Sequence, residues 1–149
     1  MENLKLLKNN KILIIAAHPD DEMLGCGGTI VKLKEKNDIN AIFLTNGVSA
    51  RTKSKKAANI RKKECLSLFK KLNLAKPEIL NFPDNQLDKV PLLRIIKKIE
   101  LVIKKLRPNI IFTHYENCLN IDHQITYRAT LTACRPLKTN PVKTILSFE

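Results

Sequence analysis

Aromatic side chains are scarce in this chain of 149 residues: tryptophan is absent, and phenylalanine and tyrosine together supply only 5% of it. Proteins that bind single-stranded nucleic acid stack the bases on aromatic rings, so this scarcity argues against that function. No apolar run reaches the roughly 20 residues that a membrane-spanning helix needs. The N-terminal sequence Met-Glu-Asn lacks the apolar segment of a signal peptide. These absences predict a cytoplasmic protein with no membrane span.

Closely spaced cysteine pairs are also missing. The four cysteines, Cys26, Cys65, Cys118 and Cys134, lie far apart and form no C-x-x-C pattern. This spacing argues against a zinc ribbon and against a redox-active pair. Reduced thiols, as expected in the cytosol, are the simpler interpretation.

Acidic residues are few beside the basic ones, 14 against 27, which gives a formal net charge of +13. Such a charge can attract nucleic acid or other anions. The lysines are spread along the chain at the polar positions of amphipathic helical patterns, which indicates solvated faces. Two alternatives stay open: binding of nucleic acid, and steering of an anionic small substrate.

Apolar runs and helical patterns alternate along the chain. Continuous apolar runs predict buried strands at 11–17, 39–44 and 109–113, with further strands at 78–82 and 142–148. Helical patterns cover residues 22–37, 57–72, 91–106 and 123–134. The order βαβαβαβαβ predicts a single α/β domain over residues 1–149. We expect a Rossmann-like doubly wound sheet, mostly parallel, with strand order 3-2-1-4-5 and helices on both faces.

Three glycines, Gly25, Gly27 and Gly28, suggest a nucleotide-binding loop but lie in the wrong place. A dinucleotide fingerprint directly follows a strand, whereas these glycines come well after the strand ends at Ala17. They fall inside the first predicted helix, where glycine costs about 1 kcal/mol relative to alanine. Close packing of this helix against the sheet is the better explanation.

Polar side chains follow each predicted strand where it ends, and those ends meet at one edge of a parallel sheet. A catalytic zinc site needs about three nitrogen or oxygen ligands and one open position. His18 and Asp21 supply two ligands from one turn, and His123 supplies a third from the neighbouring strand's end. Asp20 either accepts a proton from the attacking water or caps the following helix. Asp122 either orients a ligand or caps its own helix.

The sequences Ala17-His18-Pro19-Asp20-Asp21-Glu22 and Asp122-His123 resemble the two signature motifs of the PIG-L/LmbE-like family of metal-dependent deacetylases. Residues 81–88 and 132–136 are also similar to family segments. The resemblance implies zinc-dependent removal of an N-acetyl group from an N-acetylglucosamine-type sugar conjugate. It also implies His18, Asp21 and His123 as metal ligands and Asp20 as the general base.

The resemblance further implies that Asp84 contacts the sugar and that Arg61 lies near the substrate, although a solvent-facing Arg61 is an equal alternative. The family often has a histidine where this chain has Asn120, and an amide can donate a hydrogen bond to an oxyanion but no proton. The general acid is therefore open, with protonated Asp20 first and His114, at the end of its strand, second. The family often has Asp-Gly where this chain has Asn46-Gly47.

The combined interpretation is a zinc hydrolase of an acylated amino sugar, in which Fe²⁺ could replace Zn²⁺. Hydrolysis of another N-acyl or nucleotide-linked sugar is the alternative within enzymes, and a basic binding module with a degenerate site is the alternative outside them. Family members extend beyond the strand at 142–148. We therefore expect a truncated or minimal form that binds metal and covers its exposed sheet face by self-association or with a partner.

Overall fold

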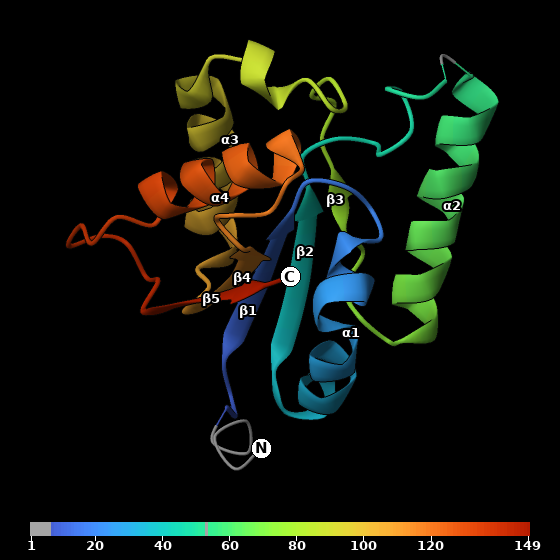
Figure 1. Cartoon of the computed structure of the whole chain (residues 1–149). Helices are drawn as coiled ribbons and strands as arrows, with labels where there is room; N and C mark the ends of the chain where they lie inside the picture. Colours follow the sequence, from blue (N-terminus) through green and yellow to red (C-terminus); the bar gives the residue numbers. More distant parts are fainter. Residues whose placement is uncertain (1–6, 53) are drawn as a thin grey trace.

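A computed structural model describes residues 7–52 and 54–149 (Figure 1). Its five strands pair in parallel in the order β3-β2-β1-β4-β5, which confirms the predicted fold. The strands are β1 (Lys11–Ala16), β2 (Asp38–Phe43), β3 (Glu78–Ile79), β4 (Ile110–His114) and β5 (Thr144–Phe148). The helices are α1 (Asp21–Leu33), α2 (Lys55–Lys71), α3 (Leu92–Leu106) and α4 (Ile121–Ala133), with short 3-10 turns η2 (Lys34–Lys36) and η3 (Leu87–Lys89).

The helices cover both faces of the sheet, with α1 and α2 on one side and α3 and α4 on the other (Figure 1). Alternate residues of β1 serve the two layers. Leu13 and Ile15 belong to the core under α3 and α4, whereas Ile12 and Ile14 belong to the core under α1 and α2. Because both faces are covered, β1 carries a continuous apolar sequence rather than an alternating one.

The strand β5 differs from its prediction. The sequence predicted a buried strand, but only Phe148 is buried, while Thr144 and Ser147 are exposed. The reason is its place at the edge of the sheet, where β4 is its paired neighbour. The ring of Phe148 lies beside that of His114, with their centroids 5.0 Å apart.

Glycine allows the close packing of α1 that the sequence predicted. A Cβ atom at Gly25 would collide with the ring of Phe148. The helix also departs from helical geometry at Cys26, between two glycines. Gly25 therefore lets α1 approach the end of β5.

None of the helices in residues 7–52 and 54–149 is long and apolar enough to cross a lipid bilayer.

Candidate metal centre

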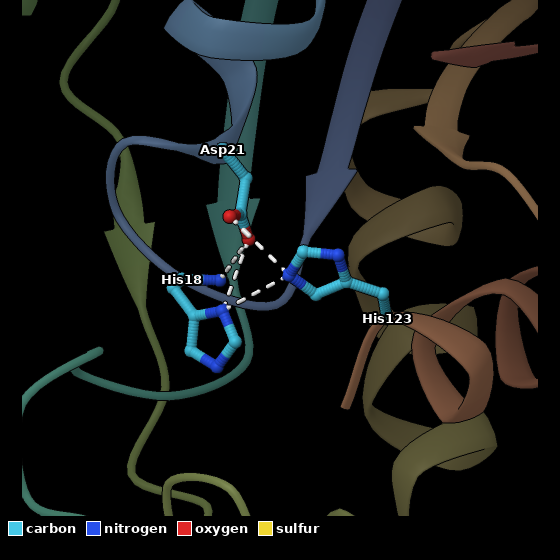
Figure 2. A group of neighbouring side chains, drawn as sticks. All are labelled: His18, Asp21 and His123. Atoms are coloured by element: carbon cyan, nitrogen blue, oxygen red, sulfur yellow. Dashed lines mark hydrogen bonds and ion pairs between the residues drawn. The ribbon is translucent and has the colours of Figure 1, made fainter. Parts of the chain in front are cut away.

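Three predicted ligands meet at the carboxyl edge of the sheet. His18 lies in the turn between β1 and α1, and Asp21 is the first residue of α1. His123 lies in the first turn of α4, directly after the loop that follows β4. Because β1 and β4 are adjacent strands, these turns face one another. Figure 2 shows the three side chains pointing toward a common centre.

The spacing of the ligand atoms suits a tetrahedral metal ion. Nδ1 of His18 lies 3.2 Å from Oδ2 of Asp21, and Nε2 of His123 lies 3.3 Å from Oδ1 of Asp21. The two nitrogens are 3.3 Å apart. Bonds of about 2.0–2.1 Å in a tetrahedral site place neighbouring ligands about 3.3–3.4 Å apart. The donor set of two imidazoles and one carboxylate therefore fits zinc in both chemistry and size.

Two further carboxylates lie behind His18. Its Nε2 atom is 3.2 Å from Oδ1 of Asp84 and 3.2 Å from Oδ2 of Asp122. Burial disfavours a charged His18, but the hydrogen bonds to Asp122 and Asp21 outweigh burial and raise the pKa of His18 to about 10. The surroundings of His18 thus favour a positive charge at this position. With Nε2 donating to the carboxylates, Nδ1 is the nitrogen left for a cation.

Asp21 faces all the imidazoles of the site. Burial would raise its pKa, but contacts with His114, His123 and His18 hold the pKa of Asp21 well below its usual range. The backbone N–H of His18 also donates to Oδ2 of Asp21 at 2.8 Å. Asp21 is therefore ionised and fixed in place, as a metal ligand must be.

Asp122 orients His18, and the alternative that it caps α4 is wrong. It is fully buried and accepts the backbone N–H groups of Asn85 at 2.7 Å and Leu87 at 3.0 Å. The cap is instead Asn120, whose Oδ1 accepts the N–H of Asp122 at 2.9 Å. This bond uses the oxygen of Asn120, so the amide nitrogen keeps its hydrogens for a bound group.

Asp84 is buried under the loop that follows β2 rather than open to solvent. Thr45 donates to its Oδ1 at 3.2 Å, and the N–H of Ala50 donates to its Oδ2 at 2.8 Å. The same loop needs glycine at position 47, where φ is +68° and a Cβ would lie 3.1 Å from Cβ of His18. These contacts fit a role in orienting His18, and contact of Asp84 with a sugar stays a prediction.

His114 supports the site from inside the protein. Its ring is buried and stacks on that of His123, with centroids 3.8 Å apart and planes 18° apart. The N–H of Ala17 donates to its Nε2 at 2.9 Å. Burial lowers the pKa of His114, and the contact with Asp21 opposes this effect. This environment suits a supporting ring better than a proton donor, and the predicted catalytic role stays untested.

Asp20 and Arg61 form a pair beside the three ligands. The Nη1 group of Arg61, on α2, donates to the carbonyl of Pro19 at 3.1 Å and contacts Oδ2 of Asp20. Asp20 stands at the N-cap position of α1, but its side chain makes no capping bond. The carboxylate of Glu22 accepts the N–H of Asp20 at 3.0 Å instead. Asp20 adopts a positive φ of 144°, which is strained for a residue other than glycine.

Sequence reasoning missed two residues of the site. Cys118, in the loop after β4, places Sγ 3.2 Å from Nδ1 of His123, and no sequence pattern marks it. Glu22 stands in the first motif, but the sequence assigns it no role; it is buried, and burial raises its pKa to about 7.

A cleft of about 170 Å³ lies beside the ligand turn. It is lined by Pro19, Asn46, Ala58, Asn59, Lys62, Ile79 and Asn81. The lining thus includes three amide side chains and one ammonium group, close to Pro19, which directly follows His18. Such groups can bind hydroxyls and an anion.

Comparison with known proteins agrees with this site. The family described as PIG-L, GlcNAc-PI de-N-acetylase, matches residues 13–134. The uncharacterised deacetylase YaiS of Escherichia coli strain K12 is 31% identical over 136 residues, which cover 87% of this chain and 71% of YaiS. A probable N-acetyl-alpha-D-glucosaminyl L-malate deacetylase 2 of Bacillus cereus is 29% identical over 131 residues, which cover 82% of this chain and 60% of that protein.

Among solved structures, the conserved protein TT1542 from Thermus thermophilus superposes with a TM-score of 0.77 at 28% identity. The alignment covers 93% of this chain and 66% of that one. The segment that matches the family contains all three ligands of the candidate metal centre, from His18 to His123. The chain belongs to the PIG-L family.

Proposed function

We propose that this chain is a metal-dependent hydrolase that removes the N-acetyl group from an N-acetylglucosamine-type sugar conjugate. The observation that carries the proposal is the tetrahedral spacing of His18, Asp21 and His123, with contacts of 3.2–3.3 Å between their ligand atoms. The names of the relatives support the reaction, since one is an uncharacterised deacetylase and another a probable N-acetyl-alpha-D-glucosaminyl L-malate deacetylase.

Zn²⁺ is the ion we assign to the site, with Fe²⁺ as the alternative in the cell. His18 Nδ1, an oxygen of Asp21 and His123 Nε2 would hold it. An ion there would polarise the amide carbonyl and lower the pKa of water. Asp84 and Asp122 would keep the Nε2–H of His18 turned away from the ion.

Asp20 is the general base of the proposed reaction. Its carboxylate would accept a proton from the attacking water and return it to the leaving amine. Arg61 fixes the position of that carboxylate and of the Pro19 carbonyl through one guanidinium nitrogen. Arg61 therefore acts on the base, and direct contact with the substrate stays a prediction.

Asn120 would stabilise the oxyanion through its amide nitrogen. The helix cap holds its oxygen against the backbone of Asp122, which orients the amide without using the donor hydrogens. Donors fixed in advance stabilise developing charge because they need no reorganisation. His114 would keep the ring of His123 in place by stacking, rather than supply a proton.

The cleft beside Pro19 would hold the sugar conjugate. The amides of Asn46, Asn59 and Asn81 can donate to and accept from sugar hydroxyls. Lys62 would pair with an acidic group on the conjugate, which agrees with the high positive charge of the chain.

Acetate and amine release test the proposal. The chain is stripped with chelator, reloaded with Zn²⁺ or Fe²⁺, and incubated with N-acetylglucosaminyl malate, diacetylchitobiose and related conjugates. We expect free amine from the loaded protein and none from the stripped protein or from Asp21→Ala. Amine release no greater than that of Asp21→Ala, at full metal loading and with every conjugate, rejects the proposal.

A non-catalytic binding module is the competing hypothesis from another class. It requires that the site no longer holds metal, so the purified protein would contain no stoichiometric ion. Metal analysis of the purified chain separates the two hypotheses before any substrate is found.

A further inference from the structure

Cys118 contacts one ring nitrogen of His123, which is a candidate metal ligand. Its Sγ atom is 3.2 Å from Nδ1 of His123, whose other nitrogen, Nε2, faces Asp21 and His18. The other three cysteines are buried, and burial raises the pKa of each thiol to about 12. Cys118 is only half-buried and stands in the loop that joins β4 to α4.

This contact bears on the tautomer of His123, because each ring nitrogen of a histidine can either donate or accept a hydrogen bond. A neutral imidazole carries one proton, and the nitrogen that binds a metal must be the other one. If Nε2 is the ligand, Nδ1 carries the proton and donates it to the sulfur of Cys118. Groups that accept this second N–H fix the tautomer and the angle of a metal-binding histidine.

The loop holds the sulfur in place for this contact. Gln124, in the first turn of α4, donates its side-chain N–H to the carbonyl of Cys118 at 2.7 Å. On its face, the ring of His123 stacks on that of His114 at 3.8 Å. The ring is thus fixed by stacking on one face and by sulfur at one edge, and the edge contact is the one that distinguishes its two nitrogens.

We propose that Cys118 is a positioning residue that holds His123 in the tautomer and orientation needed to bind the metal, and so sets the metal affinity of the centre. This inference rests on the proposed function, since it takes His123 as a ligand. Sulfur is a weak acceptor, so this hydrogen bond is modest. The group that orients His123 is therefore a neutral thiol rather than a carboxylate.

A pair of variants that differ by one oxygen atom tests the inference. Cys118→Ala removes the acceptor, and Cys118→Ser restores an acceptor of similar size. Zinc affinity is measured by competition with a chelator, and the visible absorption spectrum of the Co²⁺-loaded protein reports the ligand geometry. We expect Cys118→Ala to lose about 10–100-fold in affinity and to change the cobalt spectrum. Cys118→Ser should recover most of both.

Cys134→Ala is the matched control, because Cys134 lies at the far end of α4 and its loss should leave affinity and spectrum unchanged. Thermal unfolding of each variant defines a temperature at which all are folded. Less than a threefold loss in Cys118→Ala, or an equal loss in Cys118→Ser, overturns the inference. His123→Ala is measured in parallel: unchanged affinity there rejects His123 as a ligand and with it the proposed function, whereas a large loss there leaves that function standing.

Discussion

The two candidate histidine ligands, His18 and His123, have different partners behind them. Nε2 of His18 lies 3.2 Å from oxygens of both Asp84 and Asp122, which are buried carboxylates. Nδ1 of His123 lies 3.2 Å from a thiol, and its ring stacks on another imidazole. Negatively charged groups therefore stand behind His18, and neutral groups stand behind His123.

This difference indicates how the two histidines share the binding of the ion. A carboxylate partner makes a histidine ligand more basic and fixes it more firmly than a thiol does. We therefore expect His18 to be the tightly held ligand and His123 the weaker one. Asp122 and His123 are neighbours in sequence, yet the first serves His18 and the second faces the ion site directly.

Asp21 contacts both histidines, so its removal should have the largest effect. Asp21→Ala deletes a ligand and leaves His18 and His123 facing each other with no charge between them. We expect metal content to fall from about one ion per chain to a small fraction of that. Elemental analysis measures this, with the exposed Asp88→Ala as control. Equal metal content in the two variants would rule out Asp21 as a ligand.

The variant Asp20→Asn distinguishes an effect on catalysis from an effect on metal binding. Asp20→Asn keeps the shape of the side chain but cannot accept a proton, so kcat should fall about 10²–10⁴-fold. The metal content should stay at the parental level, because Asp20 contacts Arg61 rather than the ligands. Activity within about threefold of the parent would show that Asp20 is not the base.

The order of the strands and the meeting of His18, Asp21 and His123 at one edge of the sheet could be predicted from the sequence. Buried parallel strands have continuous apolar sequences, and their carboxyl ends meet at one edge, so the sequence predicts that His18, Asp21 and His123 converge. The half-exposed β5 was not foreseen, because an apolar run does not reveal whether a strand has a neighbour on both sides. Phe148 alone is buried there.

The partners behind the ligands could not be predicted, because they depend on side-chain direction. Asp122 and Asn120 are both good helix caps by residue type, and only the backbone geometry assigns the cap to Asn120 and the ligand contact to Asp122. Cys118 lies five residues before His123 in an irregular loop, where no periodicity fixes which side chain turns inward. His114 was expected at the site, but its burial and its bond from Ala17 were not.

Asn120, like Asp20, has a proposed role in the reaction, and it caps the helix that carries His123. Asn120→Asp keeps an oxygen that can cap α4 but removes the amide donors. If Asn120 stabilises the oxyanion, kcat should fall about 10²-fold with little change in KM and in melting temperature. Asn120→Ala should lose the cap as well, at about 0.5–2 kcal/mol of stability. Full activity in both variants would remove Asn120 from the mechanism.

Asp122→Asn tests the comparison itself, because it replaces a buried charge behind His18 with a neutral group. Three donors face this side chain: the Nε2–H of His18 and two backbone N–H groups. The carboxylate offers them two acceptor oxygens, whereas the amide of the variant would offer only one. At least one buried donor would lose its acceptor, which costs about 1–3 kcal/mol and lowers the melting temperature by several degrees for a domain of this size. Metal affinity should fall about 10–100-fold.

The informative quantity is the ratio of this loss to the loss in Cys118→Ala, measured by the same chelator competition. A carboxylate behind His18 should matter more than a thiol behind His123, because an ionised acceptor forms hydrogen bonds roughly twice as strong as a neutral one. Asp38→Asn, at the opposite end of the sheet, controls for the loss of one negative charge. A smaller loss in Asp122→Asn than in Cys118→Ala would reverse the assignment of the tight and the weak ligand. His123 would then be the ligand that anchors the ion.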